Sequence, residues 1–211
     1  MLLDLDSWRS LLKAVAATWE ANIDRFNEID SAFGDGDHGV TVSKIARVVV
    51  RSAGDPALTS ISSLLNAIGT GTMAVGGGSA GPLYGMVFTG LAEAVEAEPV
   101  DATTLAAMLA SARRSLESLT NARPGDKTLM DALIPATESG QAAVDQGVTA
   151  ILAQAAQAAS AGAEATKNMV AKFGRARSYG EQTLGTPDAG ALSMALLFEG
   201  LYRGLTESAA S

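Results

Sequence analysis

Three closely spaced aspartates are the residues of this chain whose chemistry is easiest to interpret. Asp30, Asp35 and Asp37 lie in the segment 28–39, which reads EIDSAFGDGDHG, and the only histidine, His38, follows them directly. Glycine lets the backbone turn tightly, so the three carboxylates can converge on one point. Converging carboxylates repel one another unless a cation lies among them, and oxygen ligands favour Mg²⁺, Ca²⁺ or Mn²⁺. The segment therefore predicts a metal site, and the metal is expected to hold a phosphate.

Two simpler explanations of this cluster compete with a Mg²⁺ site. A calcium-binding EF-hand loop needs Glu at its twelfth position. That position is Thr41 when counted from Asp30, and it is Ala46 when counted from Asp35, so the EF-hand fails. A solvated acidic turn, in which Asp37 caps the following helix, stays open. Three aspartates with glycines between them favour the metal, and they suit two ions as well as one.

A glycine-rich segment, 70–82, has the composition of a loop that a phosphate can approach closely. Its three consecutive glycines, 76–78, precede Ser79 and Ala80 at the start of a predicted helix. Free N–H groups at a helix N-terminus bind anions. The segment is not a Walker A loop, because no Gly-Lys-Ser/Thr follows. The alternative is a flexible turn in which Ser79 caps the helix.

The segment 123–128, RPGDKT, opens another predicted helix. Thr128 or Asp126 could cap this helix, and Lys127 could either reach a phosphate or pair with an acid. Leu129 and Met130 follow, and they could pack on an adenine or simply belong to the core. These residues fit a role in phosphate or adenine binding and a purely structural role equally well.

The segment 174–181 is the only clustered basic loop on an acidic chain, with Arg175 and Arg177. Guanidinium groups bind phosphate through paired hydrogen bonds; the alternative is a surface ion pair with Glu181. Asp188 then caps the last predicted helix, and the small residues Ala189 and Gly190 leave its first N–H groups approachable.

His38 could act as a general base or as a phosphate carrier. It could equally orient the loop or contact a ligand through its backbone. Phosphoryl transfer consists mostly of positioning and charge neutralisation and can proceed without a protein base. We therefore expect His38 to support the site and not to carry a covalent intermediate.

The composition predicts one helical domain over residues 1–211. The chain is 47% hydrophobic but only 5% aromatic, and a core of Ala, Leu, Val and Met favours helix. A net charge of −8 argues against nucleic acid as a partner. The chain has no cysteine, and its first residues lack the pattern of a signal peptide. Its apolar stretches are broken well before the roughly 18 residues of a membrane span, so we expect a cytoplasmic protein without membrane contact.

Apolar residues at helical spacing predict eight helices and no strand. The predicted ranges are 7–28, with Ser7 as N-cap, then 39–52, 58–73, 79–96, 102–119, 128–145, 148–173 and 188–206, with a frayed tail over 208–211. The connections after the second, fourth and sixth helices are plain turns. Those after the first, third, fifth and seventh are the four unusual segments described above.

This alternation has a spatial consequence. Alternate connections of an up-down helical array lie at the same end, so the four unusual segments should meet at one rim. The rim would also gather the N-termini of four helices, whose free N–H groups and partial positive charge suit the phosphates of a nucleotide.

The succession GDGDHG, GGGSAGPLYG, GDKTLMDAL, GRARSYGE and PDAGA resembles the nucleotide-binding L subunit (DhaL) of dihydroxyacetone kinase, in order, over nearly the whole chain. The resemblance implies an all-α closed barrel of eight antiparallel up-down helices with a nucleotide at one rim. It also implies two Mg²⁺ on Asp30, Asp35 and Asp37, with these residues and Arg175 as the catalytic set. The remaining residues expected to bind ADP or ATP are His38, Gly39, Val40, Thr41, Gly78, Ser79, Ala80, Thr120, Thr128, Leu129, Asp188, Ala189 and Gly190.

The sequence departs from the family pattern at four places. Ser79-Ala80 replaces the usual Ala-Ser or Thr-Ser, which leaves open which hydroxyl serves the phosphate. Leu129 stands where methionine is common, and Thr120 where glycine is common. The family's Asp-Pro-Gly is Asp188-Ala189-Gly190, which keeps the cap and loses the rigidity of proline.

The resemblance further implies that this chain is half of an enzyme of glycerol metabolism. A separate K subunit would hold a short ketose, and the two would form a hetero-oligomer, or the L subunit a homodimer. In the phosphoenolpyruvate-dependent phosphotransferase system, resident ADP is rephosphorylated by a phosphohistidine protein, the M subunit, and this is the preferred expectation. The alternatives are a subunit of an ATP-dependent dihydroxyacetone or erythrulose kinase, a fatty acid kinase domain, and a non-enzymatic nucleotide-binding regulatory module.

Overall fold

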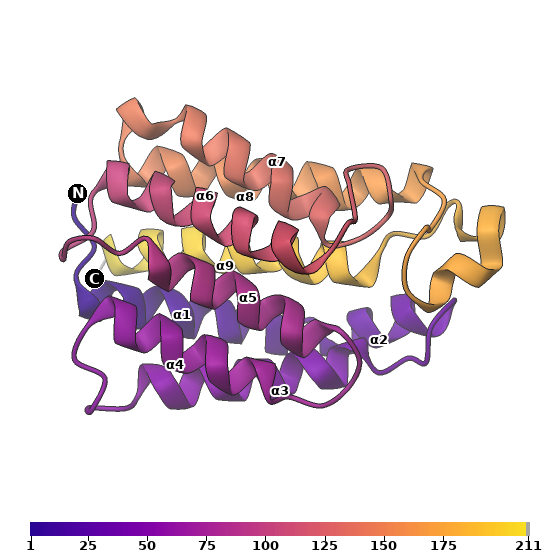
Figure 1. The fold of residues 1–211 in the computed structure, drawn as a ribbon, viewed down its shortest axis with the longest axis horizontal. Coiled ribbons are helices and arrows are strands. Elements are labelled where there is room, and N and C mark those ends of the chain that lie inside the picture. Colours follow the sequence, from indigo (N-terminus) through magenta and orange to yellow (C-terminus); the bar gives the residue numbers. More distant parts are fainter. Residues whose placement is uncertain (210–211) are drawn as a thin grey trace.

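The computed structural model describes residues 1–209 and is built almost entirely of helices (Figure 1). The helices are α1 (Leu5–Glu20), α2 (Ile23–Ser31), α3 (His38–Ala53), α4 (Ile61–Met73), α5 (Ala80–Glu93), α6 (Ala102–Leu119), α7 (Met130–Ala142), α8 (Val148–Ala165) and α9 (Ala189–Ala209). Three 3₁₀ segments add η1 (Val144–Gln146), η2 (Thr166–Asn168) and η3 (Arg175–Thr183). Within residues 1–209 the only β pairing is an isolated bridge between Leu3 and Val100.

The helices form a closed ring, which confirms the predicted all-α barrel. Each helix packs against its neighbours in sequence, and α9 packs against α1. The helices α1 and α2 follow one another along the barrel and together occupy one of its eight helix positions (Figure 1). Glycines on α9 allow the closure, since a Cβ added to Gly200 would lie 2.5 Å from Cα of Val15, and one added to Gly204 would lie 2.8 Å from Cα of Leu11.

The core lies inside this ring and is mostly aliphatic. Its largest fully buried side chains are few: Trp8, Trp19, Tyr84, Phe26, Phe88 and Phe198. Leu, Ile, Val and Ala fill the remaining space, as the low aromatic content predicts. None of the helices over residues 1–209 combines the length and the apolar character that crossing a membrane requires.

Two predicted boundaries are wrong at the first helix. The range 7–28 is interrupted after Glu20, because the side chain of Asn22 donates to the carbonyl of Thr18 (2.9 Å) and its N–H to that of Trp19 (2.9 Å). An Asn side chain that competes for backbone partners ends a helix. The N-cap is Asp4 and not Ser7: Asp4 Oδ1 accepts the N–H and the hydroxyl of Ser7 at 2.8 and 2.6 Å.

Other boundaries move by a few residues. The range 58–73 begins at Ile61, where Ser60 and Ser63 cap each other reciprocally. The ranges 79–96 and 128–145 shorten to α5 and α7, and 148–173 ends at Ala165. The predicted frayed tail is helical through Ala209, and residues 210 and 211 lie outside the described residues.

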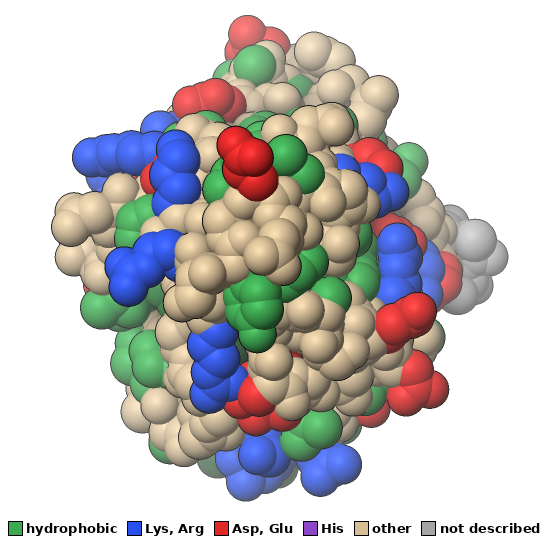
Figure 2. Space-filling view, turned by 90° about the vertical axis from the view of Figure 1, so that its right-hand side faces the viewer, with side chains coloured by type: hydrophobic (Ala, Val, Ile, Leu, Met, Phe, Trp, Pro, Cys, Tyr) green, Lys and Arg blue, Asp and Glu red, His purple; other side chains and the backbone are tan. Residues whose placement is uncertain are grey.

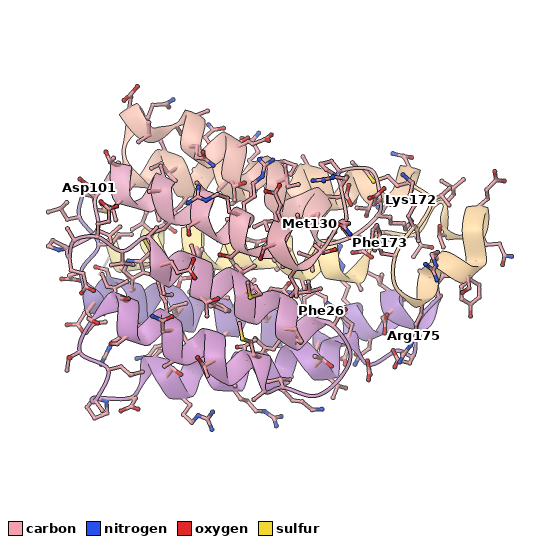
Figure 3. The ribbon with its side chains drawn as sticks, in the orientation of Figure 1. Phe26, Asp101, Met130, Lys172, Phe173 and Arg175 are labelled. Carbon is pink, nitrogen blue, oxygen red and sulfur yellow. The ribbon has the colours of Figure 1, made fainter. Side chains whose placement is uncertain are left out.

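The four unusual connections do meet at one end of the barrel, at the right of Figure 1. The plain turns and the two chain ends lie at the opposite end. Met130, Lys172, Phe173 and Arg175 lie toward the rim, while Asp101 lies at the far end (Figure 3). The alternation read from the sequence is therefore confirmed, and it places the candidate residues around one opening.

A test of the packing comes from Gly162 on α8, because a Cβ there would lie 2.0 Å from the backbone oxygen of Asp131 on α7. Gly162→Ala should lower the free energy of unfolding by about 1–3 kcal/mol, since the two helices must separate. Ser160→Ala, on the exposed side of the same helix, should change it by less than about 0.5 kcal/mol. Urea denaturation of both variants measures the difference; equal stabilities would contradict the close approach.

Candidate functional site

A cavity of about 700 Å³ opens at the rim. Figure 2 looks onto this end of the molecule, where Lys and Arg side chains alternate with apolar ones. All four unusual segments contribute to the lining. The sequence-predicted residues that line it are Asp30, Asp35, Asp37, His38, Gly78, Ser79, Ala80, Thr120, Thr128, Leu129, Arg175, Asp188, Ala189 and Gly190. Gly39, Val40 and Thr41 were also predicted but are not among the lining residues.

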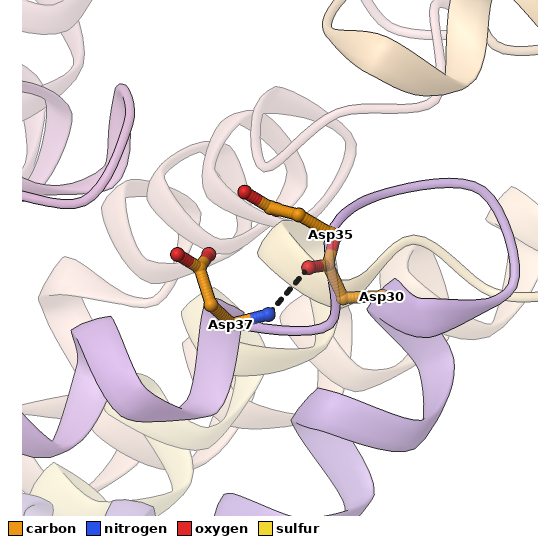
Figure 4. A group of neighbouring side chains, drawn as sticks. All are labelled: Asp30, Asp35 and Asp37. Atoms are coloured by element: carbon orange, nitrogen blue, oxygen red, sulfur yellow. Dashed lines mark hydrogen bonds between the residues drawn. The ribbon is translucent and has the colours of Figure 1, made fainter.

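The three aspartates converge at one side of the cavity (Figure 4). One ligand oxygen from each lies within 4.8 Å of the others. Asp30 lies in the last turn of α2, and its Oδ2 accepts the backbone N–H of Asp37 at 3.1 Å. A Cβ at Gly34 would lie 2.3 Å from Asp30 Oδ1, so the turn requires glycine there. Three carboxylates without nitrogen or sulfur ligands fit a hard cation such as Mg²⁺.

The capping part of the simpler interpretation of the acidic turn does not hold. Asp37 occupies the N-cap position of α3, but its side chain makes no capping hydrogen bond. Its carboxylate is instead directed toward the other two aspartates (Figure 4). The side chain of Asp37 therefore belongs to the carboxylate cluster and does not cap α3.

The basic loop supplies the one cation paired with this cluster among residues 1–209. Arg175 Nη1 forms an ion pair with Asp35 Oδ2 across the cavity. The expected alternative, a pair with Glu181, is not formed. Both partners are exposed, at 63% and 43% of their side-chain area, so the pair itself contributes at most about 1 kcal/mol. Its value lies in holding a guanidinium beside the three carboxylates.

The glycine loop is held from behind by α3. Thr41 Oγ1 donates to the carbonyl of Gly77 at 3.2 Å. Gly77 and Gly78 have φ angles of +127° and +81°, which a side chain rarely adopts. Ser79 lies at the N-cap of α5 without a side-chain capping bond, contrary to the capping alternative. Thr41 is thus placed to shape the loop and not to face the cavity.

The start of α3 is also fixed from outside the cavity. Asn27 Oδ1 accepts the N–H of Gly39 at 2.8 Å and that of Val40 at 3.3 Å. A Cβ at Gly39 would lie 2.3 Å from the carbonyl oxygen of Ile23. These two predicted residues therefore occupy the junction between α2 and α3.

The predicted cap of the last helix is confirmed. Asp188 Oδ1 accepts the N–H of Ala191 at 2.7 Å. Burial raises the pKa of the Asp188 carboxyl to about 7; the N–H of Ala191 opposes this shift, and the charge of Asp131 adds to it. Lys127 acts against the rise and Asp30 with it, more weakly. Asp188 is therefore a carboxyl close to half protonated at neutral pH in the protein without ligands.

His38 is tied to the barrel interior. Its Nε2 lies 2.8 Å from Ser193 Oγ, which also lies 2.8 Å from the Tyr84 hydroxyl. Ser193 is fully buried, and its carbonyl accepts the Trp19 indole N–H at 2.8 Å. Burial lowers the pKa of His38, against the nearby charge of Asp30. The ring is thus neutral and anchored, which suits the supporting role that the sequence predicts.

Sequence reasoning missed Tyr84, Ser193 and the function of Lys127 and Asp131. Ser193 stands in an apolar helical run with no signal of its own. Lys127 lines the cavity, and its ammonium contacts four backbone carbonyls. Neither Asp126 nor Thr128 caps α7, because the N-cap is Leu129 and it has no side-chain capping bond. The carboxylate of Asp131 accepts the N–H groups of Gly125 and Thr128 at 2.5 and 2.7 Å.

Comparisons with known proteins agree with this geometry. Residues 32–203 match the family described as DAK2 domain. The chain is 39% identical over 197 residues to D-erythrulose kinase of Mycolicibacterium smegmatis, covering 89% of this chain and 34% of that one. It is 28% identical to the ADP-binding subunit DhaL of a PEP-dependent dihydroxyacetone kinase of Listeria innocua, covering 87% of this chain and 88% of that one.

A solved structure supports the fold. The dihydroxyacetone kinase of C. freundii in complex with AMP-PNP and Mg²⁺ superposes with a TM-score of 0.70 at 29% identity, covering 92% of this chain and 33% of that one. Its native form gives a TM-score of 0.73. The chain spans about a third of the length of the first curated relatives that it matches.

Asp188 should make the stability of the ligand-free protein depend on pH. Its pKa is about 7 in the folded chain, against about 3.9 for an exposed aspartate. Between these values the unfolded chain binds fewer protons than the folded one, so stability falls as the pH rises. Urea denaturation with a chelator at about pH 5 and about pH 8 should show the lower free energy of unfolding at the higher pH.

The matched control is Asp188→Asn, which keeps an oxygen able to accept the N–H of Ala191. This variant should lose most of the difference between the two pH values. A pH dependence of the same size in both proteins would contradict the assignment to Asp188.

Proposed function

Because this chain belongs to the DAK2 domain family, we propose that it is the nucleotide-binding unit of a ketose kinase. It would bind ADP or ATP with Mg²⁺ in the rim cavity and pass the terminal phosphoryl group to a short ketose on a separate K subunit. The observation that carries the proposal is the convergence of Asp30, Asp35 and Asp37 beside helix N-termini that line one cavity. The absence of cysteine fits the cytoplasmic location that the sequence predicts.

The residues divide the binding task. Asp30, Asp35 and Asp37 would hold Mg²⁺, as one ion or two. The bound metal would supply charge neutralisation. Gly78, Ser79 and Ala80 would offer backbone N–H groups to the phosphates at the start of α5. Leu129 and Thr120 would contact the base, and Ala189 and Gly190 would close the site at the start of α9.

The transfer itself asks little covalent chemistry of the protein. The bond between the terminal phosphorus and its bridging oxygen breaks and leaves its electron pair on that oxygen of ADP, a bond to the ketose hydroxyl oxygen forms, and the hydroxyl proton passes to water. Arg175, which already lies beside Asp35, would meet the charge that develops on the transferred group. His38 would stay neutral and hold the loop through Ser193.

Two sources of the phosphoryl group remain candidates. A PEP-dependent relative described as an ADP-binding subunit aligns over 88% of its own length, which supports resident ADP with an M subunit as donor. Relatives described as erythrulose kinases and triokinases are 32–39% identical, which supports a subunit of an erythrulose or dihydroxyacetone kinase that uses ATP. The chain is 39% identical to the erythrulose kinase of M. smegmatis and 28% identical to the PEP-dependent subunit, and this difference in identity favours the second candidate.

The metal assignment is tested by calorimetry with ADP and Mg²⁺. Asp35→Asn should weaken nucleotide binding by about a hundredfold or more, equivalent to about 2.8 kcal/mol, because it removes a metal ligand. Asp24→Asn, on the exposed face of α2, is the control and should bind as the wild type does. Undiminished binding by Asp35→Asn would reject the metal site.

The phosphoryl donor is tested on the purified protein. Denaturation should release ADP in a one-to-one ratio if the nucleotide is resident, as in the phosphotransferase-dependent candidate. Release of little or no nucleotide, with ATP binding restored by Mg²⁺, would favour the ATP-dependent kinase. Resident ADP that no phosphohistidine protein rephosphorylates would point to a regulatory module instead.

A further inference from the structure

Lys127 carries a buried charge that none of the proposed functional roles uses. The residue is 4% exposed. Its Nζ lies 3.0 Å from the carbonyl oxygen of Thr166, 3.1 Å from that of Met169, 2.5 Å from that of Thr183 and 2.6 Å from that of Thr186. An ammonium has three protons and no acceptor, so four carbonyls share three donors. Such a cradle can compensate the cost of burying a cation.

The four carbonyls come from the two ends of one segment. Thr166 and Met169 follow the end of α8, while Thr183 and Thr186 lie at the end of η3 and just beyond it. A single ammonium therefore fastens both ends of the segment 170–182, which crosses the rim between them. Arg175 lies within this segment (Figure 3) and reaches Asp35 on the other side of the cavity.

Further hydrogen bonds close the base of the segment around the same point. The N–H of Gly185 donates to the carbonyl of Lys167 at 2.8 Å. Thr183 Oγ1 accepts the N–H of Ala171 at 3.1 Å. The two ends thus form one hydrogen-bonded base around the Lys127 ammonium, and Lys172 adds an ion pair with Asp126 at 2.7 Å.

The backbone of Lys127 is itself specially placed. Its φ of +61° is the only positive φ of a non-glycine residue within residues 1–209, and such a conformation persists only where neighbouring contacts impose it. The carboxylate of Asp131 supplies those contacts by accepting the N–H groups of Gly125 and Thr128. The loop therefore directs the lysine ammonium into the base of the segment, beside the cavity that Lys127 also lines.

We propose that Lys127 is a positioning residue for nucleotide binding, which acts by fixing the segment 170–182 so that Arg175 faces the aspartate cluster. This inference rests on the proposed function of the cavity. Lys127 touches no substrate in this role. Its effect on nucleotide affinity should pass through Arg175 and should vanish when the guanidinium is absent.

A double-mutant cycle measures that dependence on the full chain, with Mg²⁺-ADP affinity determined by calorimetry. Lys127→Met keeps a long apolar side chain but leaves four carbonyls without their donor, and it should weaken binding by about tenfold. Arg175→Met should weaken it by a similar factor. The double variant should be weaker than either single variant by no more than about twofold, because the two residues act in series.

Two companion variants separate positioning from general stability. Lys127→Arg keeps a cation with several donors and should recover most of the affinity. Lys13→Met removes an exposed lysine that does not line the rim cavity and should bind as the wild type does. Hydrogen exchange of the amides of 170–187 should accelerate in Lys127→Met while the amides of α1 and α3 keep their protection.

The outcomes are separable. If wild-type protein binds no Mg²⁺-ADP, the proposed function fails. If it binds, but Lys127→Met and Arg175→Met weaken binding independently, or Lys127→Met has no effect, only the positioning role fails. Should Lys127→Met not fold, the cycle is run with Lys127→Gln, whose amide still serves two carbonyls, and independent effects again contradict the proposal.

Discussion

The closure of the barrel between α9 and α1 is the contact on which the rest of the molecule depends. Gly200 and Gly204 let the two helices approach at backbone distance. This approach brings the N-terminus of α9, with Asp188, to the rim, and it places Ser193 under His38. A larger residue at either glycine would push α9 away from α1. The start of α9, which lines the cavity, would then be displaced. The chemistry at the rim is therefore fixed by packing along the side of the barrel.

The sequence predicted the parts of this architecture that follow from local rules. Helical periodicity identified the helices of the barrel, and the position of the unusual segments after alternate helices identified the rim. The cap at Asp188 followed from a local pattern as well. The break at Asn22 was missed, because a polar residue within an apolar period gives little warning. Lys127 and Ser193 were missed for another reason: their partners are 39 to 174 residues away in sequence, and no local pattern encodes such contacts.

The site balances charges that would otherwise oppose folding. Asp30, Asp35 and Asp37 converge at the cavity, and Asp131 and Asp188 lie close behind it. Arg175 and Lys127 are the cations placed among them, the first exposed at the cavity and the second buried against four carbonyls. Arg175 thus neutralises the carboxylates, and Lys127 fastens the segment 170–182.

Both described ends of the chain lie at the end of the barrel opposite the rim (Figure 1). A polypeptide tether joined at either end would start at the end of the barrel opposite the rim and would not cross the mouth of the cavity. The same helical unit is therefore compatible with covalent fusion to a ketose-binding module and with association as an independent subunit. In the fused arrangement, the length of the tether, and not the barrel, would set how far such a module could lie from the cavity.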